Sequence, residues 1–140
     1  MKLLLYALTT ACLPLRHLSL SSPYGYRLHP VTGRYSFHSG VDLRAHADTV
    51  FAVLPGRITA VRYDRLLGIS IRYASGRFLI TNGHLSQYFV LPGDTVSGGQ
   101  PLGITGATGR VTGEHLHFTV QLDNRCIDPL QFLAAALKEF

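Results

Sequence analysis

Short apolar segments separated by turn residues dominate the hydrophobic pattern of this chain. Alternating or continuous apolar stretches bounded by Gly, Pro, Asn or Ser are typical of β-strands. Such stretches are Arg16–Ser21, Thr49–Leu54, Arg57–Tyr63, Leu67–Tyr73, Arg77–Thr81, Leu102–Thr105 and Leu116–Leu122. Because several short strands are joined by turns, the pattern predicts an all-β fold built on an antiparallel sheet or sandwich.

The C-terminal end has a helical pattern instead. Asp128 can cap a helix, and Pro129 suits the first helical position. Leu130, Phe132, Leu133 and Leu137 then provide an apolar face. We therefore expect a short helix at the C-terminus.

Length and composition favour one small globular domain. With 140 residues, of which 46% are hydrophobic, the chain can bury a core but has no room for a second domain. We place this domain at residues 14–140. The net charge of +5 comes from scattered Arg and Lys residues without a basic run, so we do not expect nucleic-acid binding.

Residues 1–13 have a separate character. Lys2 precedes an apolar stretch that ends near Ala11-Cys12, a pattern typical of a secretory signal and close to that of a lipoprotein processing site. A bilayer-spanning helix needs about 20 apolar residues, so we expect no transmembrane helix here. The alternative is an apolar strand or helix that covers an edge of the domain.

The two cysteines, Cys12 and Cys126, do not form a cysteine framework. They could pair in an oxidising compartment, and Cys12 could be lipidated. We expect both to be structural or free.

Candidate chemistry lies in four histidines and one aspartate: His38-x-x-x-Asp42, Gly83-His84-Leu85 and His115-x-His117. Imidazole and carboxylate groups hold zinc in hydrolytic sites, where water keeps the fourth position. On an extended chain, residues two or four apart point to the same face, so each pair could converge on one ion. Each motif alone is weak evidence for a metal site. The alternative is that these are ordinary histidines of the core or the surface.

These motifs occur in a larger pattern. It consists of Ser22-Pro-Tyr-Gly-Tyr-Arg-Leu-His-Pro-Val-Thr-Gly33, His38 to Leu43, Gly83 to Ser86, Gly93 to Gln100 and Thr108-Gly109 to Phe118. From about Pro14 to about Leu133, the chain resembles the lysostaphin-type (LytM-like) family of peptidoglycan zinc metalloendopeptidases.

The resemblance implies a role for each motif residue. His38, Asp42 and His117 would bind one Zn²⁺ per chain, and His115 and His84 would be the catalytic pair. We assign His115 as the base and His84 as the group that stabilises the oxyanion, although the two roles could be exchanged.

Three positions depart from the family pattern. Asn82 stands where an aromatic residue is frequent, Thr119 where an acidic residue is frequent, and Glu114 where proline is common. We expect Tyr24, Arg27 and Asn82 to contact substrate. Arg27 and His29 could instead brace their loop through backbone hydrogen bonds.

The implied function is a zinc endopeptidase that cuts the peptide cross-links of peptidoglycan. We expect a monomer that acts in the cell envelope, in the periplasm or outside the cell, and is either exported or lipid-anchored. Family members split glycine bridges or D-alanyl to diamino-acid cross-links, and the segment from Tyr24 to Pro30 resembles the latter group slightly better. The alternative function is a catalytically silent domain that binds wall peptides or activates a partner hydrolase.

Overall fold

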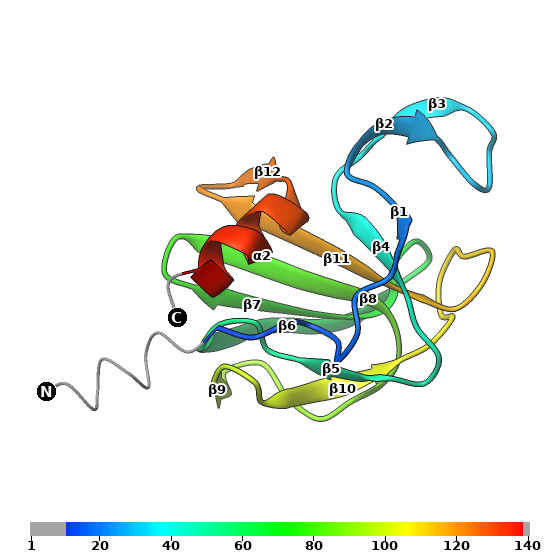
Figure 1. Cartoon of the computed structure of the whole chain (residues 1–140). Coiled ribbons are helices and arrows are strands. Elements are labelled where there is room, and N and C mark those ends of the chain that lie inside the picture. The colour runs from blue at the N-terminus through cyan, green and yellow to red at the C-terminus, as the bar shows by residue number, and fades with distance from the viewer. Residues whose placement is uncertain (1–10, 139–140) are drawn as a thin grey trace, which may run out of the picture.

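An antiparallel sheet makes up most of the fold in the computed structural model, which describes residues 11–138 (Figure 1). Seven strands follow one another across it in the order β1 (Leu20–Ser22), β4 (Val41–Arg44), β11 (His115–Leu122), β8 (Phe78–Tyr88), β7 (Gly68–Ser75), β6 (Gly56–Asp64) and β9 (Thr95–Val96). Off this path, β10 (Pro101–Thr105) pairs with β5 (Thr49–Phe51) and β8, and β12 (Arg125–Ile127) pairs with β11. The predicted all-β antiparallel fold is confirmed.

A short helix, α2 (Pro129–Lys138), follows the last strand and packs near β11. The Asp128 carboxylate accepts a hydrogen bond from the Leu130 amide at 2.9 Å, and the Asp128 carbonyl accepts one from Phe132. Phe132 and Leu133 are buried against the sheet. The helix and its cap match the sequence prediction.

Six of the seven predicted strands are confirmed. The segments predicted at 57–63, 67–73, 102–105 and 116–122 correspond to β6, β7, β10 and β11, and those at 49–54 and 77–81 overlap β5 and β8. The prediction at Arg16–Ser21 was largely wrong, because Arg16 to Ser19 lie outside any strand and are exposed. The short strands β4, β9 and β12 were missed because two to four residues give too little periodicity.

The core lies on one face of β11 and its neighbours. Leu116, Phe118 and Val120 are fully buried, and their side chains alternate with His115, His117 and Thr119 on the opposite face. Strand β4 contributes Val41 and Leu43 to the same core. The alternation therefore directs the two histidines of β11 away from the core.

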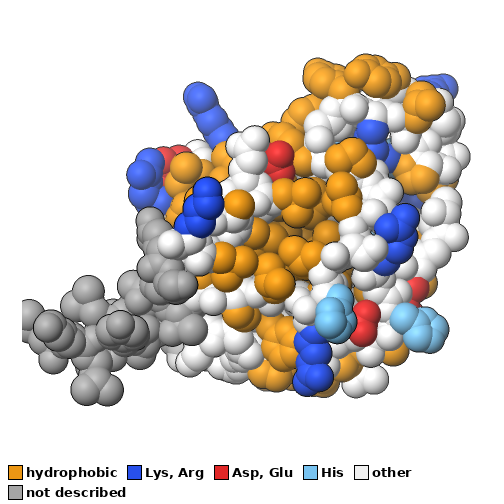
Figure 2. Space-filling view, in the orientation of Figure 1, with side chains coloured by type: hydrophobic (Ala, Val, Ile, Leu, Met, Phe, Trp, Pro, Cys, Tyr) orange, Lys and Arg blue, Asp and Glu red, His pale blue; other side chains and the backbone are white. Residues whose placement is uncertain are grey.

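A separate two-stranded hairpin, β2 (Gly25–Leu28) and β3 (Tyr35–His38), projects beside β1 and β4 (Figure 1). Four of its residues, Tyr26, Leu28, Tyr35 and Phe37, are exposed and form a hydrophobic cap that Figure 2 shows as an orange cluster. The rings of Tyr26 and Tyr35 stack with centroids 5.6 Å apart. The side chains that alternate with this cap include Arg27 and His38.

Both cysteines are free within residues 11–138, so the alternative of a disulfide between Cys12 and Cys126 is contradicted. The Cys12 thiol donates a hydrogen bond to the Ala52 carbonyl at 3.1 Å, and burial raises the pKa of this thiol. The predicted N-terminal segment falls mostly on residues 1–10, which lie outside the described part. In the part that is described, no helix has the length and apolar character to cross a membrane.

Candidate metal centre

His38 and Asp42 flank a sharp turn instead of lying on one strand. His38 ends β3, and Asp42 lies in β4, with Ser39 and Gly40 between them. A Cβ atom on Gly40 would lie 2.5 Å from the Phe118 carbonyl oxygen and 2.6 Å from the Thr119 methyl group. Only glycine therefore allows this turn to approach β11 so closely.

His115 and His117 lie on one face of β11, as the two-residue spacing predicts. In the sheet, His117 pairs directly with Asp42 of β4 and with Gly83 of β8. This register brings residues 75 positions apart in the chain into contact.

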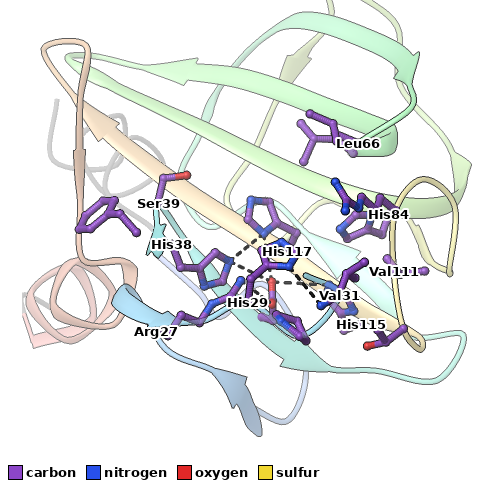
Figure 3. Close-up of a pocket in the computed structure, with 16 residues that line it drawn as sticks. Arg27, His29, Val31, His38, Ser39, Leu66, His84, Val111, His115 and His117 are labelled. Atoms are coloured by element: carbon purple, nitrogen blue, oxygen red, sulfur yellow. Dashed lines mark hydrogen bonds and ion pairs between the residues drawn. The ribbon is translucent and has the colours of Figure 1, made fainter. Parts of the chain in front are cut away.

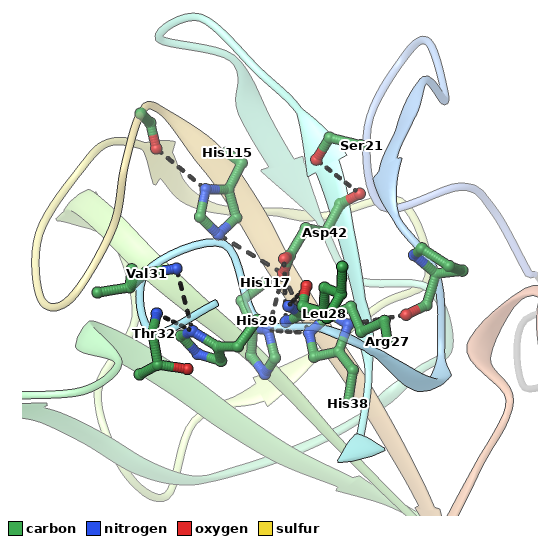
Figure 4. Close-up of polar contacts among 12 residues, drawn as sticks. Ser21, Arg27, Leu28, His29, Val31, Thr32, His38, Asp42, His115 and His117 are labelled. Carbon is green, nitrogen blue, oxygen red and sulfur yellow. Dashed lines mark hydrogen bonds and ion pairs between the residues drawn. The ribbon is translucent and has the colours of Figure 1, made fainter. Parts of the chain in front are cut away.

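Three side chains converge on one point: His38, Asp42 and His117 (Figure 3, Figure 4). Asp42 Oδ1 lies 3.0 Å from His117 Nδ1 and 3.3 Å from His38 Nε2, and the two ring nitrogens are 3.3 Å apart. Ligand atoms about 2.1 Å from one tetrahedral zinc ion would lie about 3.4 Å apart. The three residues therefore fit a zinc ion.

The backbone fixes the orientation of the His38 ring. Its Nδ1 lies 2.9 Å from the Pro23 carbonyl oxygen, which can only accept a hydrogen bond. His38 therefore carries its proton on Nδ1 and presents the Nε2 lone pair to Asp42 and His117. A metal ligand whose second nitrogen donates to a carbonyl group is the usual arrangement in zinc sites.

Asp42 remains ionised in this setting. Burial of the carboxyl group opposes ionisation, but hydrogen bonds and charge interactions with His117 and His38 outweigh it and hold the pKa of Asp42 below its ordinary range. Arg27 adds a positive charge, with its Nη2 3.9 Å from Asp42 Oδ2. A charged carboxylate next to two imidazoles is a donor set that a divalent cation prefers.

His84 and His115 face each other beside this triad, with ring centroids 4.7 Å apart. His84 Nδ1 lies 2.7 Å from the Thr108 carbonyl, and His115 Nδ1 lies 3.0 Å from the Gly113 carbonyl. In its neutral form, each ring therefore carries its proton on Nδ1 and has a free lone pair on Nε2. His115 Nε2 lies 3.5 Å from Asp42 Oδ1.

The environment of His84 keeps its ring neutral. Burial is the main cause, and the nearby His115 and His117 add to it, lowering the pKa of His84 to about 4. Its backbone has a positive φ of 62°, and its amide donates to the Leu67 carbonyl at 2.6 Å. An αL conformation at a histidine stores strain, which is frequent at functional positions.

The triad and the histidine pair lie in a cleft of about 380 Å³ (Figure 3). Arg27 and His29 line one wall of this cleft. The His29 ring also accepts hydrogen bonds from the amides of Val31 and Thr32, so it braces its own loop as well (Figure 4).

Two of the expected substrate contacts lie elsewhere. Asn82 is fully buried and pairs across the sheet with the core residue Phe118, so it does not line the cleft. Tyr24 also lies outside the cleft lining, and its hydroxyl donates to the Cys126 carbonyl at 3.2 Å. Glu114 accepts a hydrogen bond from the Ala47 amide, which ties the loop before His115 to the chain after β4.

Sequence analysis missed two residues of the site. Thr108 orients His84 through its carbonyl, and Arg110 lines the cleft. Both lie in the Thr108-Gly109-Arg110 segment that precedes the His-x-His pair, and that position in the motif was the available signal.

Comparison with known proteins gives consistent matches. Residues 36–129 match the sequence profile of Peptidase family M23. The chain is 36% identical over 120 residues to the DD-carboxypeptidase/endopeptidase Mpg of Neisseria meningitidis, covering 84% of this chain and 27% of that protein. It thus spans about a quarter of the length of this relative.

Solved structures agree with this match. A zinc-containing peptidase from Vibrio cholerae has a TM-score of 0.68 at 31% identity, over 80% of this chain and 39% of the other. The catalytic domain of lysostaphin from Staphylococcus simulans has a TM-score of 0.76 at 29% identity, over 84% of this chain and 92% of that domain.

Proposed function

The chain belongs to peptidase family M23, and we propose that it is a zinc-dependent endopeptidase that hydrolyses peptide cross-links of bacterial peptidoglycan. The convergence of His38, Asp42 and His117 within one cleft carries this proposal. The pair formed by His84 and His115 beside the triad supports a catalytic role over simple metal storage. The site of action would be the cell envelope.

One zinc ion would be held by His38 Nε2, Asp42 Oδ1 and His117 Nδ1. When bound, zinc supplies a Lewis acid and lowers the pKa of a coordinated water to about 7. The protein contributes the rest. Pro23 and Arg27 hold the ligands in position, and the cleft orients the substrate peptide.

The two remaining histidines would move protons at their Nε2 atoms. His84 is neutral at pH 7, so it can accept a proton and pass it to the leaving amine, but it has no Nε2 proton to donate to an oxyanion. Neutral His115 has the same arrangement, with its Nδ1 directed at the Gly113 carbonyl and its Nε2 3.5 Å from Asp42 Oδ1. Either ring could therefore take the proton, and both assignments of the base and of the group that stabilises the oxyanion stay open.

The names of the relatives support a D,D cross-link as the bond that is cut. They include the Mpg enzyme above and the peptidoglycan DD-endopeptidase ShyB of Vibrio cholerae, which is 37% identical over 111 residues. Lysostaphin also matches, at 33% identity over 121 residues. Glycine bridges, the other class of cross-link expected from the sequence pattern, are the second candidate.

Digestion of purified peptidoglycans of both cross-link types, followed by mass spectrometry of the fragments, tests the activity and the bond. Zinc content is measured on the same samples. We expect about one equivalent of zinc and cleavage by the unmodified protein. His84→Ala and His115→Ala should keep the metal but lose hydrolysis by about a hundredfold or more.

The alternative of a silent wall-binding domain predicts a different result. A silent domain would bind peptidoglycan without releasing fragments, and neither histidine variant would change its behaviour. Zinc below a tenth of an equivalent, with no gain on addition of the metal, would refute the proposed metal centre.

A further inference from the structure

The cleft carries an excess of positive charge. Among its lining residues, all within the described part, Arg27 and Arg110 are cationic and Asp42 is the one carboxylate. A zinc ion in the triad would add two further positive charges. Since clefts lined by one sign of charge concentrate ligands of the opposite sign, this cleft suits an anionic peptide.

The two arginines differ in what they contact. Arg27 is largely buried, with its Nη2 near Asp42 and its Nη1 donating to the Leu28 carbonyl at 3.4 Å. Its positive charge therefore stabilises the carboxylate of Asp42, a proposed metal ligand. The side chain of Arg110 is exposed and has no hydrogen bond or ion pair among residues 11–138.

The backbone at Arg110 is held in place although its side chain is free. The Arg110 amide donates to the Leu66 carbonyl at 3.0 Å. Gly109, with a φ of +81°, packs so closely that a Cβ atom would lie 2.3 Å from the Gly68 nitrogen. Two residues earlier, Thr108 orients His84 through its carbonyl and anchors its own hydroxyl on the Leu85 carbonyl at 2.6 Å. One tightly packed segment therefore orients the His84 ring and presents the guanidinium of Arg110 to the cleft.

We propose that Arg110 determines substrate specificity by binding a free carboxylate on a residue next to the scissile bond. This inference rests on the proposed endopeptidase function. A guanidinium binds a carboxylate through two parallel hydrogen bonds, whereas a carboxamide offers one acceptor oxygen and no charge. Arg110 would therefore distinguish the two forms of an otherwise identical peptide.

The proposal separates the two classes of cross-link. A diamino dicarboxylic acid that gives its amine to a cross-link keeps a carboxylate on the carbon next to the scissile nitrogen. A glycine bridge has no side-chain carboxylate at that place. Carboxylate recognition by Arg110 would thus favour the first class and would be lost where that carboxylate is amidated.

Two matched cross-linked peptides, one with the carboxylate next to the scissile bond and one with a carboxamide there, provide the test. For the zinc-loaded protein we expect kcat/KM to be about ten- to a hundredfold higher on the carboxylate form. Arg110→Gln should lower kcat/KM on the carboxylate form towards the value on the carboxamide form and so remove this preference. Arg110→Lys should restore part of the preference.

Arg65→Gln is the matched control, because Arg65 is exposed, lies one residue before Leu66 and does not line this cleft. It changes the net charge by the same amount and should keep the preference intact. Equal loss in both variants would assign the effect to overall charge and overturn the role of Arg110, and so would an unchanged preference in Arg110→Gln.

Binding of both peptides is measured by calorimetry in parallel, so that the two proposals fail separately. If neither peptide is cleaved but the carboxylate form binds more tightly through Arg110, the endopeptidase function is refuted and the carboxylate site stands. If both forms are cleaved and bound equally well, the carboxylate site is refuted and the endopeptidase function stands.

Discussion

Gly40→Ala tests whether the close approach of the turn to β11 builds the metal centre. The added Cβ would lie 2.5 Å from the Phe118 carbonyl oxygen, which is backbone and cannot rotate away. Ordinary contacts between heavy atoms lie near 3.5 Å, so the turn and the strand must separate by about 1 Å. His38 and Asp42 lie on either side of this turn, and His117 lies on the strand.

Zinc ligation tolerates errors in ligand distance of only about 0.2 Å, so a displacement of about 1 Å should weaken zinc binding by about ten- to a hundredfold. Competition with a chromophoric chelator measures the affinity, and circular dichroism verifies that the variant is folded. Gly113→Ala is the control, since a Cβ at Gly113 meets no atom within 4 Å and its φ is not in the left-handed region. A folded Gly40→Ala protein with wild-type zinc affinity would refute this reasoning.

Three further predictions concern stability. Asn82→Leu, which keeps the number of side-chain heavy atoms, should raise the free energy of unfolding by about 1 to 3 kcal/mol without changing hydrolysis, because both amide atoms are buried without a partner among the described residues; a fall in melting temperature would contradict this. In metal-free protein, the unfolding free energy should rise from about pH 4 to pH 6.5, because His84 binds a proton in this range when unfolded but not when folded. Urea titrations at several pH values should show a smaller increase of the unfolding free energy with pH for His84→Gln. Tyr24→Phe should lower stability by about 1 kcal/mol through loss of the hydrogen bond to Cys126 and leave kcat/KM unchanged; reduced cleavage at normal stability would return Tyr24 to the substrate-binding residues.

The sequence predicted those parts of the fold that repeat a local pattern. Strand β11 alternates clearly enough that its core face and its histidine face can be assigned by counting residues. The capped helix α2 was predictable for the same reason, because its cap and its apolar face come from neighbouring residues. By contrast, the hairpin of β2 and β3 exposes its apolar residues Tyr26, Leu28, Tyr35 and Phe37. Its apolar positions therefore do not mark a buried face.

The candidate site shows the same limit. Motif spacing identified the histidines and Asp42, but it suggested that His38 and Asp42 lie on one strand. A turn at Ser39-Gly40 brings the two side chains together in a similar way, so the spacing alone cannot distinguish the two arrangements. Asn82 was expected in the cleft from its position two residues before His84. The positive φ of His84 reverses the direction of the strand's side chains at that point, and such a conformation cannot be read from a histidine in a sequence.

The separation of the proposed metal ligands along the chain has a consequence for how the protein folds. His38 and Asp42 come from its first third, and His117 joins them only when β11 has paired with β4, across 75 residues. Contacts between such distant segments form slowly, because a long loop must close before any of its interactions are gained. A growing chain would have no complete triad until β11 had been synthesised. The rate of metal binding during refolding would therefore report the rate at which β11 pairs with β4.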